Sequence, residues 1–215
     1  MVTMKIEEKI ELIEETMIQM AKRVRVMYAS ALDVLITGDK ERALHIIESD
    51  EFVNNDEEEI NQLCVVSLSL LQPVAKDLRT VIASIKIATD LERIGDYAKN
   101  IARHVIKNDA LPKELHDHST KIGQMFLELY DATIQAYVQK DIKAVYQIPS
   151  MDDQIDQSFK LMAELLESLL LEKRSIVAPV ATIGTLRNIE RAGDHTKNIC
   201  EHIIYQIKGQ HVDFG

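Results

Sequence analysis

The sequence is poor in residues that interrupt helices. Its 215 residues include seven glycines and four prolines, and tryptophan is absent. Because glycine and proline are the strongest breakers of regular structure, we expect long helices joined by short connections. Cysteine is also scarce. Cys64 and Cys200 form no CxxC or Cys–His motif, which predicts two unpaired thiols on apolar helix faces in a reducing compartment.

Two further absences restrict the class of protein. No apolar run approaches the ~20 residues that a membrane-spanning helix needs, and the first residues lack the apolar core of a signal peptide. Any association with a membrane is therefore expected to go through a partner or through the protein surface. The formal net charge is −10 and no basic patch stands out, which argues against nucleic acid and favours cations or basic partner surfaces.

One motif occurs twice in the chain. Residues 92–106 align with residues 190–204 at an offset of 98, and nine of the 15 aligned positions are identical (Glu, Arg, Gly, Asp, Lys, Asn, Ile, His and Ile). Such a long period indicates an internal duplication. We expect the first repeat to cover 1–108 and the second 109–215.

Hydrophobic periodicity predicts an all-α fold of two tandem antiparallel three-helix bundles. Helices are expected over 4–37, 40–71 and 74–107, and the second half repeats the plan at an offset of 102. Its middle helix, 142–172, contains Pro149 and should break or kink there. Gly38 and Asp39 suit a helix end and the next helix cap. The predicted core of the second helix is Leu44, Ile47, Ile60, Leu63 and Leu70.

The repeated motif is locally unfavourable for a helix. A mid-helix glycine such as Gly95 costs about 1 kcal/mol relative to alanine, and the like charges of Glu92 and Asp96, one turn apart, cost roughly 0.2–0.5 kcal/mol. Both costs recur in the second copy. The glycine predicts close approach by a neighbouring helix, and the carboxylates predict a cation.

Each half offers two polar i, i+4 pairs on neighbouring helices. Antiparallel packing should bring the pairs of one half together, and clustered carboxylates need protons or cations. All-oxygen donors suit magnesium, manganese or iron, and His195 offers a nitrogen near the second set. Arg–carboxylate pairing without metal, through Arg93 and Arg191, is the alternative. The predicted metal ligands are Asp50, Asn54, Glu92 and Asp96 in the first half and Asp152, Asp156, Glu190 and Asp194 in the second.

The chain resembles the PhoU family of phosphate-transport regulators. The resemblance rests on the segments 71–79, 89–96 with 99–101, and 187–201. It implies two three-helix bundles and multinuclear metal clusters, with iron or zinc, held by E/D-x-x-x-D motifs. These motifs correspond to the eight residues above, with Asn54 as a departure that should weaken the first site.

The same resemblance implies a cytoplasmic negative regulator of phosphate uptake and of the phosphate-starvation response. Its implied partners are the ATPase subunit of the phosphate ABC transporter and a sensor histidine kinase, and we expect a homodimer. No nucleophile–base or nucleotide motif predicts an enzyme, and no histidine has a Glu three residues before it, as ferritin-like di-metal sites require. A non-metal helical scaffold, or an accessory of another phosphate transporter, remains as an alternative.

Overall fold

The computed structural model describes residues 5–108, 110–111, 113–171 and 177–214. Throughout these ranges the regular structure is helical, which confirms the predicted all-α fold class. Within them, no helix is both long and apolar enough to cross a membrane. The helices are α1 (Ile6–Thr37), α2 (Lys40–Leu71), α3 (Ala75–Lys107), a 3-10 turn η1 (Lys113–Leu115), α4 (His116–Gln139), α5 (Ile142–Gln147), α6 (Pro149–Leu171) and α7 (Val177–Lys208).

The helix ends follow local capping chemistry. Gly38 closes α1 with a left-handed φ of 72°, and its N–H donates to the Val34 carbonyl at 2.8 Å. Asp39 then caps α2 by accepting the backbone N–H three residues ahead, at 3.0 Å. Asp141 caps α5 in the same way, and Lys140 takes the left-handed conformation in place of Gly38. Both caps lie where the sequence predicts them.

The middle helix of the second half is divided, as its proline predicts. Gln147 ends α5 and Pro149 begins α6. Proline has no N–H to donate and its ring clashes with the preceding turn, so a continuous helix is unfavourable there. Together α5 and α6 take the place that α2 has in the first half.

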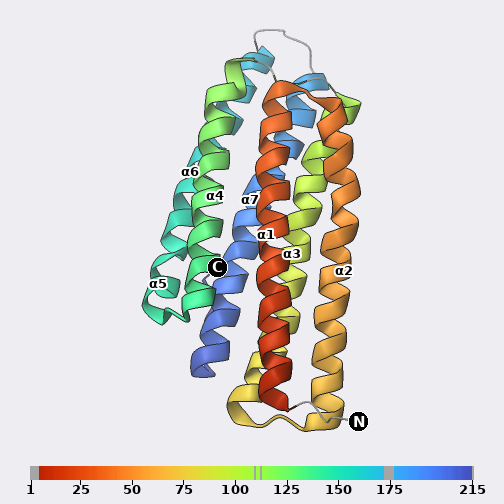
Figure 1. The fold of residues 1–215 in the computed structure, drawn as a ribbon. Coiled ribbons are helices and arrows are strands. Elements are labelled where there is room, and N and C mark those ends of the chain that lie inside the picture. Colours follow the sequence, from red (N-terminus) through yellow and green to blue (C-terminus); the bar gives the residue numbers. More distant parts are fainter. Residues whose placement is uncertain (1–4, 109, 112, 172–176, 215) are drawn as a thin grey trace.

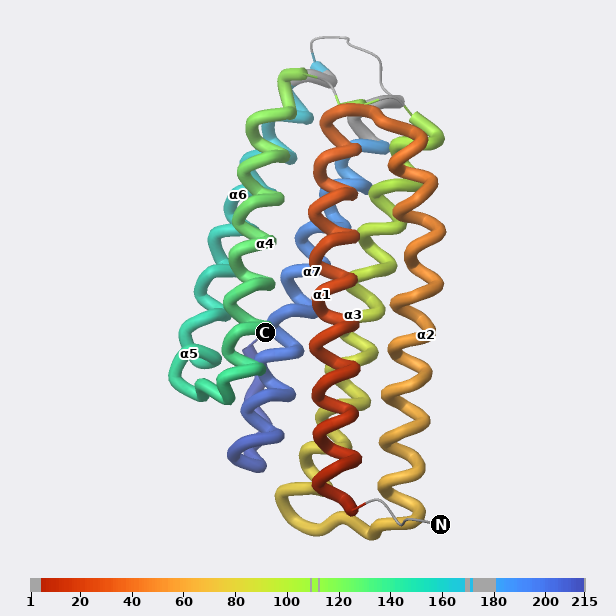
Figure 2. The backbone as a smooth tube through the Cα atoms, viewed as in Figure 1, coloured from red at the N-terminus to blue at the C-terminus, as the bar shows by residue number. Residues whose placement is uncertain are grey.

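The long helices run side by side in two related units (Figure 1). One unit contains α1, α2 and α3, and the other contains α4, α5–α6 and α7. The units meet where α3 packs against α7 and α1 packs against α4. The backbone trace shows α2 and α6 at opposite edges of this arrangement (Figure 2). The predicted tandem antiparallel three-helix bundles are confirmed.

Apolar side chains join the two units in one core. The rings of Tyr28 and Phe126 lie 4.3 Å apart between centroids. The Tyr28 hydroxyl donates to the carbonyl of Asn188 at 3.0 Å, and the Tyr130 hydroxyl donates to that of Ala21 at 2.8 Å. Buried hydroxyls therefore find partners across the interface between halves. That the first repeat covers 1–108 and the second 109–215 stays a prediction.

The predicted core of α2 is partly wrong. Ile60 is fully buried, but Leu44 and Leu70 are 51% and 74% exposed. The buried face contains Asp50 and Ser67 among its apolar residues, so a search for apolar spacing alone selected a neighbouring stripe. Its members are Ala43, Ile46, Asp50, Val53, Ile60, Cys64 and Ser67. Cys64 and Cys200 are buried free thiols, as expected.

Candidate functional site

The first candidate site lies where α2 packs against α3. It comprises Asp50, Asn54, Glu92 and Asp96, called here the first acidic group. Asp50 is 6% exposed on α2. The ammonium of Lys99 lies 2.6 Å from Asp50 Oδ2 and 2.5 Å from Asp96 Oδ1, so it links the two helices. Asn54 is exposed and donates its amide to Asp50 Oδ2 at 3.4 Å. The structure thus brings Asp50 and Asp96 together, as predicted.

Glu92 is poorly neutralised within this group. Its side chain is 16% exposed and lies 3.6 Å from Arg93. Burial raises the pKa of Glu92 to about 7, and the charges of Asp96 and Glu57 add to this effect against Arg93. Glu57 is a further α2 carboxylate, and its Oε1 accepts a hydrogen bond from Thr89 on α3 at 3.0 Å. At neutral pH the site therefore holds a carboxyl that is balanced between its two protonation states.

The second candidate site repeats this arrangement at α6 and α7. It comprises Asp152, Asp156, Glu190 and Asp194, called here the second acidic group. Asp152 is 1% exposed. The ammonium of Lys197 lies 2.9 Å from Asp152 Oδ2 and 3.3 Å from Asp194 Oδ1. Since Lys197 is the counterpart of Lys99 at an offset of 98, the duplication preserved the lysine bridge along with the acids.

The carboxylates of the second acidic group influence one another electrostatically. Burial raises the pKa of Asp152 to about 6, against the contacts with Lys197, and the charges of Asp156 and Asp194 add to the rise. Burial also raises the pKa of Glu190, and Asp194 and Asp156 are again the carboxylates that add to it. The charges of Asp156 and Asp194 therefore make Asp152 and Glu190 harder to ionise.

The mid-helix glycine has a direct structural role in the second copy. A Cβ at Gly193 would lie 2.2 Å from Asp152 Oδ1, far inside van der Waals contact. The glycine therefore lets the buried carboxylate of α6 approach the backbone of α7. In the first copy a Cβ at Gly95 would lie 3.3 Å from Val53 Cγ1, a much milder contact. The predicted close approach by a neighbouring helix is confirmed, most strongly at Gly193.

His195 does not join the second acidic group. Its Nδ1 lies 2.8 Å from Asp90 Oδ1 on α3, and its Nε2 lies 3.3 Å from the Tyr97 hydroxyl. His202 Nε2 reaches the other oxygen of Asp90 at 3.2 Å. Burial alone would raise the pKa of Asp90, but the hydrogen bonds to His195 and His202 lower it below its ordinary value. His195 therefore ties α7 to α3, and its predicted role as an extra ligand of the second group is wrong in this arrangement.

Both acidic groups suit a hard cation by charge, but not by preformed coordination. Across the described ranges, no three His, Cys, Asp or Glu side chains converge in a way that would hold a metal ion. The ammonium groups of Lys99 and Lys197 lie between the carboxylates instead. Carboxylates still outnumber these lysines, and Asp152 Oδ1 is buried without a hydrogen-bond donor from the described residues. Metal binding at the eight residues stays a prediction.

Three residues that form ion pairs in or near these sites were not predicted from the sequence. Lys99 and Lys197 stand in the repeated motif three residues after its Asp, on the face where i, i+3 pairing is possible. That spacing could have identified them. Asp90 gives no local signal, because its partners His195 and His202 lie more than 100 residues away in the chain. Arg93 contacts Glu92 and Asp96, so the predicted guanidinium pairing is present only as a supplement to the lysine.

These features define a class: a duplicated helical protein with one carboxylate–lysine group in each repeat. The family model described as the PhoU domain matches the chain twice, over residues 17–105 and 119–203. Both matches contain the repeated glycine-centred motif. The chain belongs to the PhoU family.

Curated relatives cover almost the whole chain. The phosphate-specific transport system accessory protein PhoU of Serratia marcescens is 31% identical over 95% of this chain and 85% of its own length. The Clostridium acetobutylicum homologue is 30% identical over 97% of both chains. The crystal structure of PhoU from Pseudomonas aeruginosa matches with a TM-score of 0.91 and 29% identity, covering 96% of this chain and 100% of that one. The two curated relatives are named as an accessory protein of the phosphate-specific transport system and its homologue.

Proposed function

We propose that this chain is a cytoplasmic adaptor that negatively regulates phosphate uptake and the phosphate-starvation response. The observation that carries the proposal is the double family match, together with relatives named as accessory proteins of the phosphate-specific transport system. Its paired polar groups fix helices against one another, which supports a binding role. The adaptor acts by binding, without chemistry of its own.

Its partners are the ATPase subunit of the phosphate ABC transporter and a sensor histidine kinase, and the chain works as a homodimer. Contact with the transporter brings it to the membrane surface. These assignments rest on the family resemblance. Co-purification of the wild-type chain with each partner, and light scattering of the chain alone, test them separately.

The acidic groups are proposed to take up a divalent or trivalent metal ion. Asp50, Asn54, Glu92 and Asp96 would hold one site, and Asp152, Asp156, Glu190 and Asp194 the other. The ion, whether iron, zinc, manganese or magnesium, would supply positive charge between the carboxylates. Support comes from Glu92, whose pKa burial raises to about 7, and from Asp152, whose pKa burial raises to about 6. Ionisation of both carboxyls at neutral pH therefore favours an added cation.

A scaffold without metal is the second candidate, and one observation favours it. Lys99 and Lys197 already lie between the buried acids of their groups at 2.5–3.3 Å. In that case the carboxylate–lysine groups fix the helices and nothing else is needed. The chain would then still present its surface to partners, or would serve another phosphate transporter.

One pair of substitutions tests the metal and the regulatory role together. Glu190→Ala with Asp194→Ala should remove bound metal from the second acidic group and relieve repression of phosphate uptake. Elemental analysis of protein purified without chelator or affinity-tag metal reads the first effect, and a phosphate-starvation reporter reads the second. Glu7→Ala with Glu11→Ala is the matched control, since these acids have the same i, i+4 spacing on an exposed face of α1. Metal content unchanged from wild type would favour the scaffold.

A further inference from the structure

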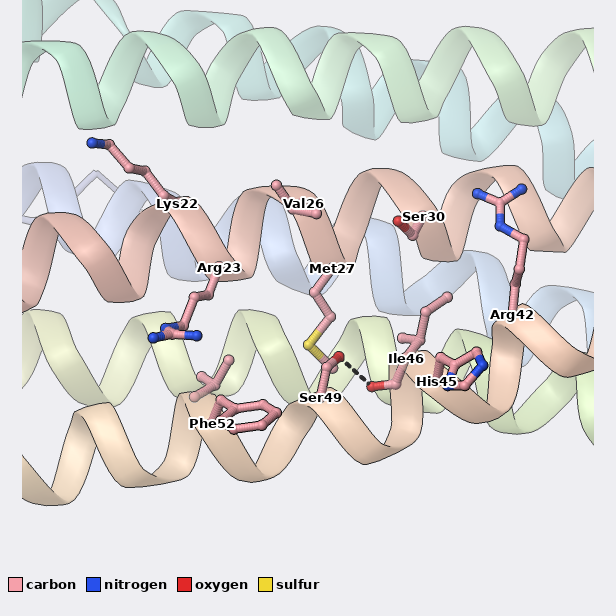
Figure 3. Close-up of a pocket in the computed structure, with 11 residues that line it drawn as sticks. Lys22, Arg23, Val26, Met27, Ser30, Arg42, His45, Ile46, Ser49 and Phe52 are labelled. Carbon is pink, nitrogen blue, oxygen red and sulfur yellow. Dashed lines mark hydrogen bonds between the residues drawn. The ribbon is translucent and has the colours of Figure 1, made fainter.

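A groove lies between α1 and α2. It has a volume of about 500 Å³. Its apolar lining includes two side chains that are largely exposed, Val26 at 67% and Phe52 at 57%. Met27 and Ile46 lie deeper between the two helices (Figure 3). The groove is therefore an apolar surface that the chain itself leaves uncovered.

Basic side chains stand at both ends of this groove. Lys22 and Arg23 lie at the Phe52 end, and Arg42 and His45 lie at the other (Figure 3). Lys22, Arg23 and Arg42 are positively charged, in a chain whose formal net charge is −10. This arrangement selects for an occupant with carboxylates at its ends and against one with lysines there.

The basic groups retain capacity to bind an outside carboxylate. Lys22 has no carboxylate at ion-pair distance among the described residues. Arg42 pairs with Asp33 and His45 with Glu48 (3.4 Å), but all four of those side chains are about half exposed or more. Exposed ion pairs of this kind contribute little to stability, so a carboxylate of the partner can replace one at small cost in free energy. Arg23 is different, because it is held by Asp56 at 2.9 Å and lies over the Phe52 ring.

The duplication supplies an internal comparison. A second groove of about 420 Å³ lies at the corresponding place in the second half and includes Ala132, Ala144, Gln147, Ile148 and Met151. At the offset of 102, the basic residues of the first groove become neutral, and its two exposed apolar residues become polar. The counterparts of Lys22, Arg23, Val26, Arg42, His45 and Phe52 are Gln124, Met125, Glu128, Ala144, Gln147 and Gln154. The fold therefore does not require the charges or the exposed apolar side chains of the first groove.

We infer that the groove between α1 and α2 is a docking site for an amphipathic helix of a partner protein that carries carboxylates at both ends of its apolar face. The lining on α2 runs from Arg42 to Val53, about 18 Å of helix at 1.5 Å per residue. A helix of three turns laid along it would place apolar side chains over Val26 and Phe52 and its acidic ends against the basic ones. The inference rests on the proposed adaptor function, for which it names one binding face.

A pair of designed peptides tests the site directly. Each is a fluorescent, stapled helix of ~16 residues with a leucine stripe at i, i+4, i+7 and i+11; one carries glutamates at both ends and the other lysines. Fluorescence anisotropy should show the glutamate peptide binding wild type at least tenfold more tightly than the lysine peptide. Rising salt should reduce that preference. Equal binding of the two peptides, or binding of neither, overturns the inference.

Variants copied from the second half locate the binding. Lys22→Gln, Arg42→Ala and His45→Gln together should abolish the preference, and Val26→Glu with Phe52→Gln should weaken the glutamate peptide at least tenfold. Lys121→Gln with Lys143→Ala is the control, since it also removes two lysine or arginine charges, from exposed positions outside the groove. An unchanged affinity in the groove variants overturns the site.

The starvation reporter separates this inference from the proposed function. If the wild-type protein fails to repress the starvation reporter, the proposed adaptor function is contradicted, whether or not the peptides bind. If wild type represses and the groove variants repress equally well, the groove has no part in that function and the inference is overturned. Loss of both peptide binding and repression in the groove variants supports it.

Discussion

Single charged residues decide how each acidic group behaves. Asp50 and Asp152 are buried on α2 and α6, and each receives one lysine ammonium, from Lys99 and Lys197. A buried charge is tolerated only when it is paired. Glu92 has no such lysine and depends on Arg93, whose side chain is 53% exposed. It is therefore the carboxyl whose protonation state responds most directly to pH or to an added cation.

Replacing Glu92 with Gln should stabilise the protein at high pH only. The folded-state pKa of about 7 lies above the ordinary 4.5, so stability falls as pH rises between these values. Gln removes that loss. Allowing for solvent screening, we expect a gain of about 1 kcal/mol at about pH 8, or roughly 2–4 °C in Tm, and little gain at about pH 4. Glu58→Gln, at an exposed position on α2, is the control. Equal gains at both pH values would contradict this account.

Glycine controls the separation between packed pairs of helices. Gly193 on α7 faces Asp152 of α6, whereas Gly95 on α3 faces a methyl group of Val53. At Gly184, by contrast, a Cβ would meet nothing within 4 Å. The same residue type therefore has three different structural roles in one fold.

Alanine at these glycines should give a graded series. Gly184→Ala should stabilise by about 1 kcal/mol through helix propensity, and Gly95→Ala should be close to neutral because its contact offsets that gain. Gly193→Ala should destabilise by about 1–3 kcal/mol through overpacking against Asp152. Urea unfolding measures all three. In a double-mutant cycle, Asp152→Ala should remove the cost of Gly193→Ala. A Gly193→Ala protein as stable as the Gly184→Ala protein would show that α6 and α7 are farther apart than in this structure.

The whole molecule is held together by contacts between the duplicated halves. α3 packs against α7, and Tyr28 of α1 packs on Phe126 of α4. Asp90 of α3 is bound by His195 and His202 of α7. The corresponding position in the second half is Asn188, so the acid of this acid–histidine cluster has no counterpart there. This part of the interface between the halves is therefore not symmetric.

We expect the two halves to unfold as one cooperative unit. Their shared core would leave apolar faces of α3 and α7 exposed if either half unfolded alone, which is unfavourable. Scanning calorimetry of the full chain should give one transition whose calorimetric and van't Hoff enthalpies agree. Two separate transitions, each reproduced by a fragment covering 5–108 or 110–214, would show instead that the repeats are independent domains.

Much of the fold could be predicted from local sequence signals. The long helices, the capping residues and the break at Pro149 depend on residues close in sequence, and the structure confirms them, while the predicted helix ends at 4 and 172 lie outside the described residues. The pairing of Asp50 with Asp96 could also be predicted, because it follows from counting along two antiparallel helices. The core of α2 could not, since Asp50 and Ser67 are polar and yet buried.

The sequence by itself determined the all-α tandem fold, because hydrophobic periodicity and the repeated motif can be read directly from the order of the residues. Its eight metal ligands stay a prediction. Only the tertiary structure decided which groups meet across the fold. It placed Lys99 and Lys197 between the carboxylates, turned His195 toward Asp90, and left Val26 and Phe52 uncovered beside basic side chains. The physical reason is that burial and charge pairing depend on distances between helices, which no local pattern specifies.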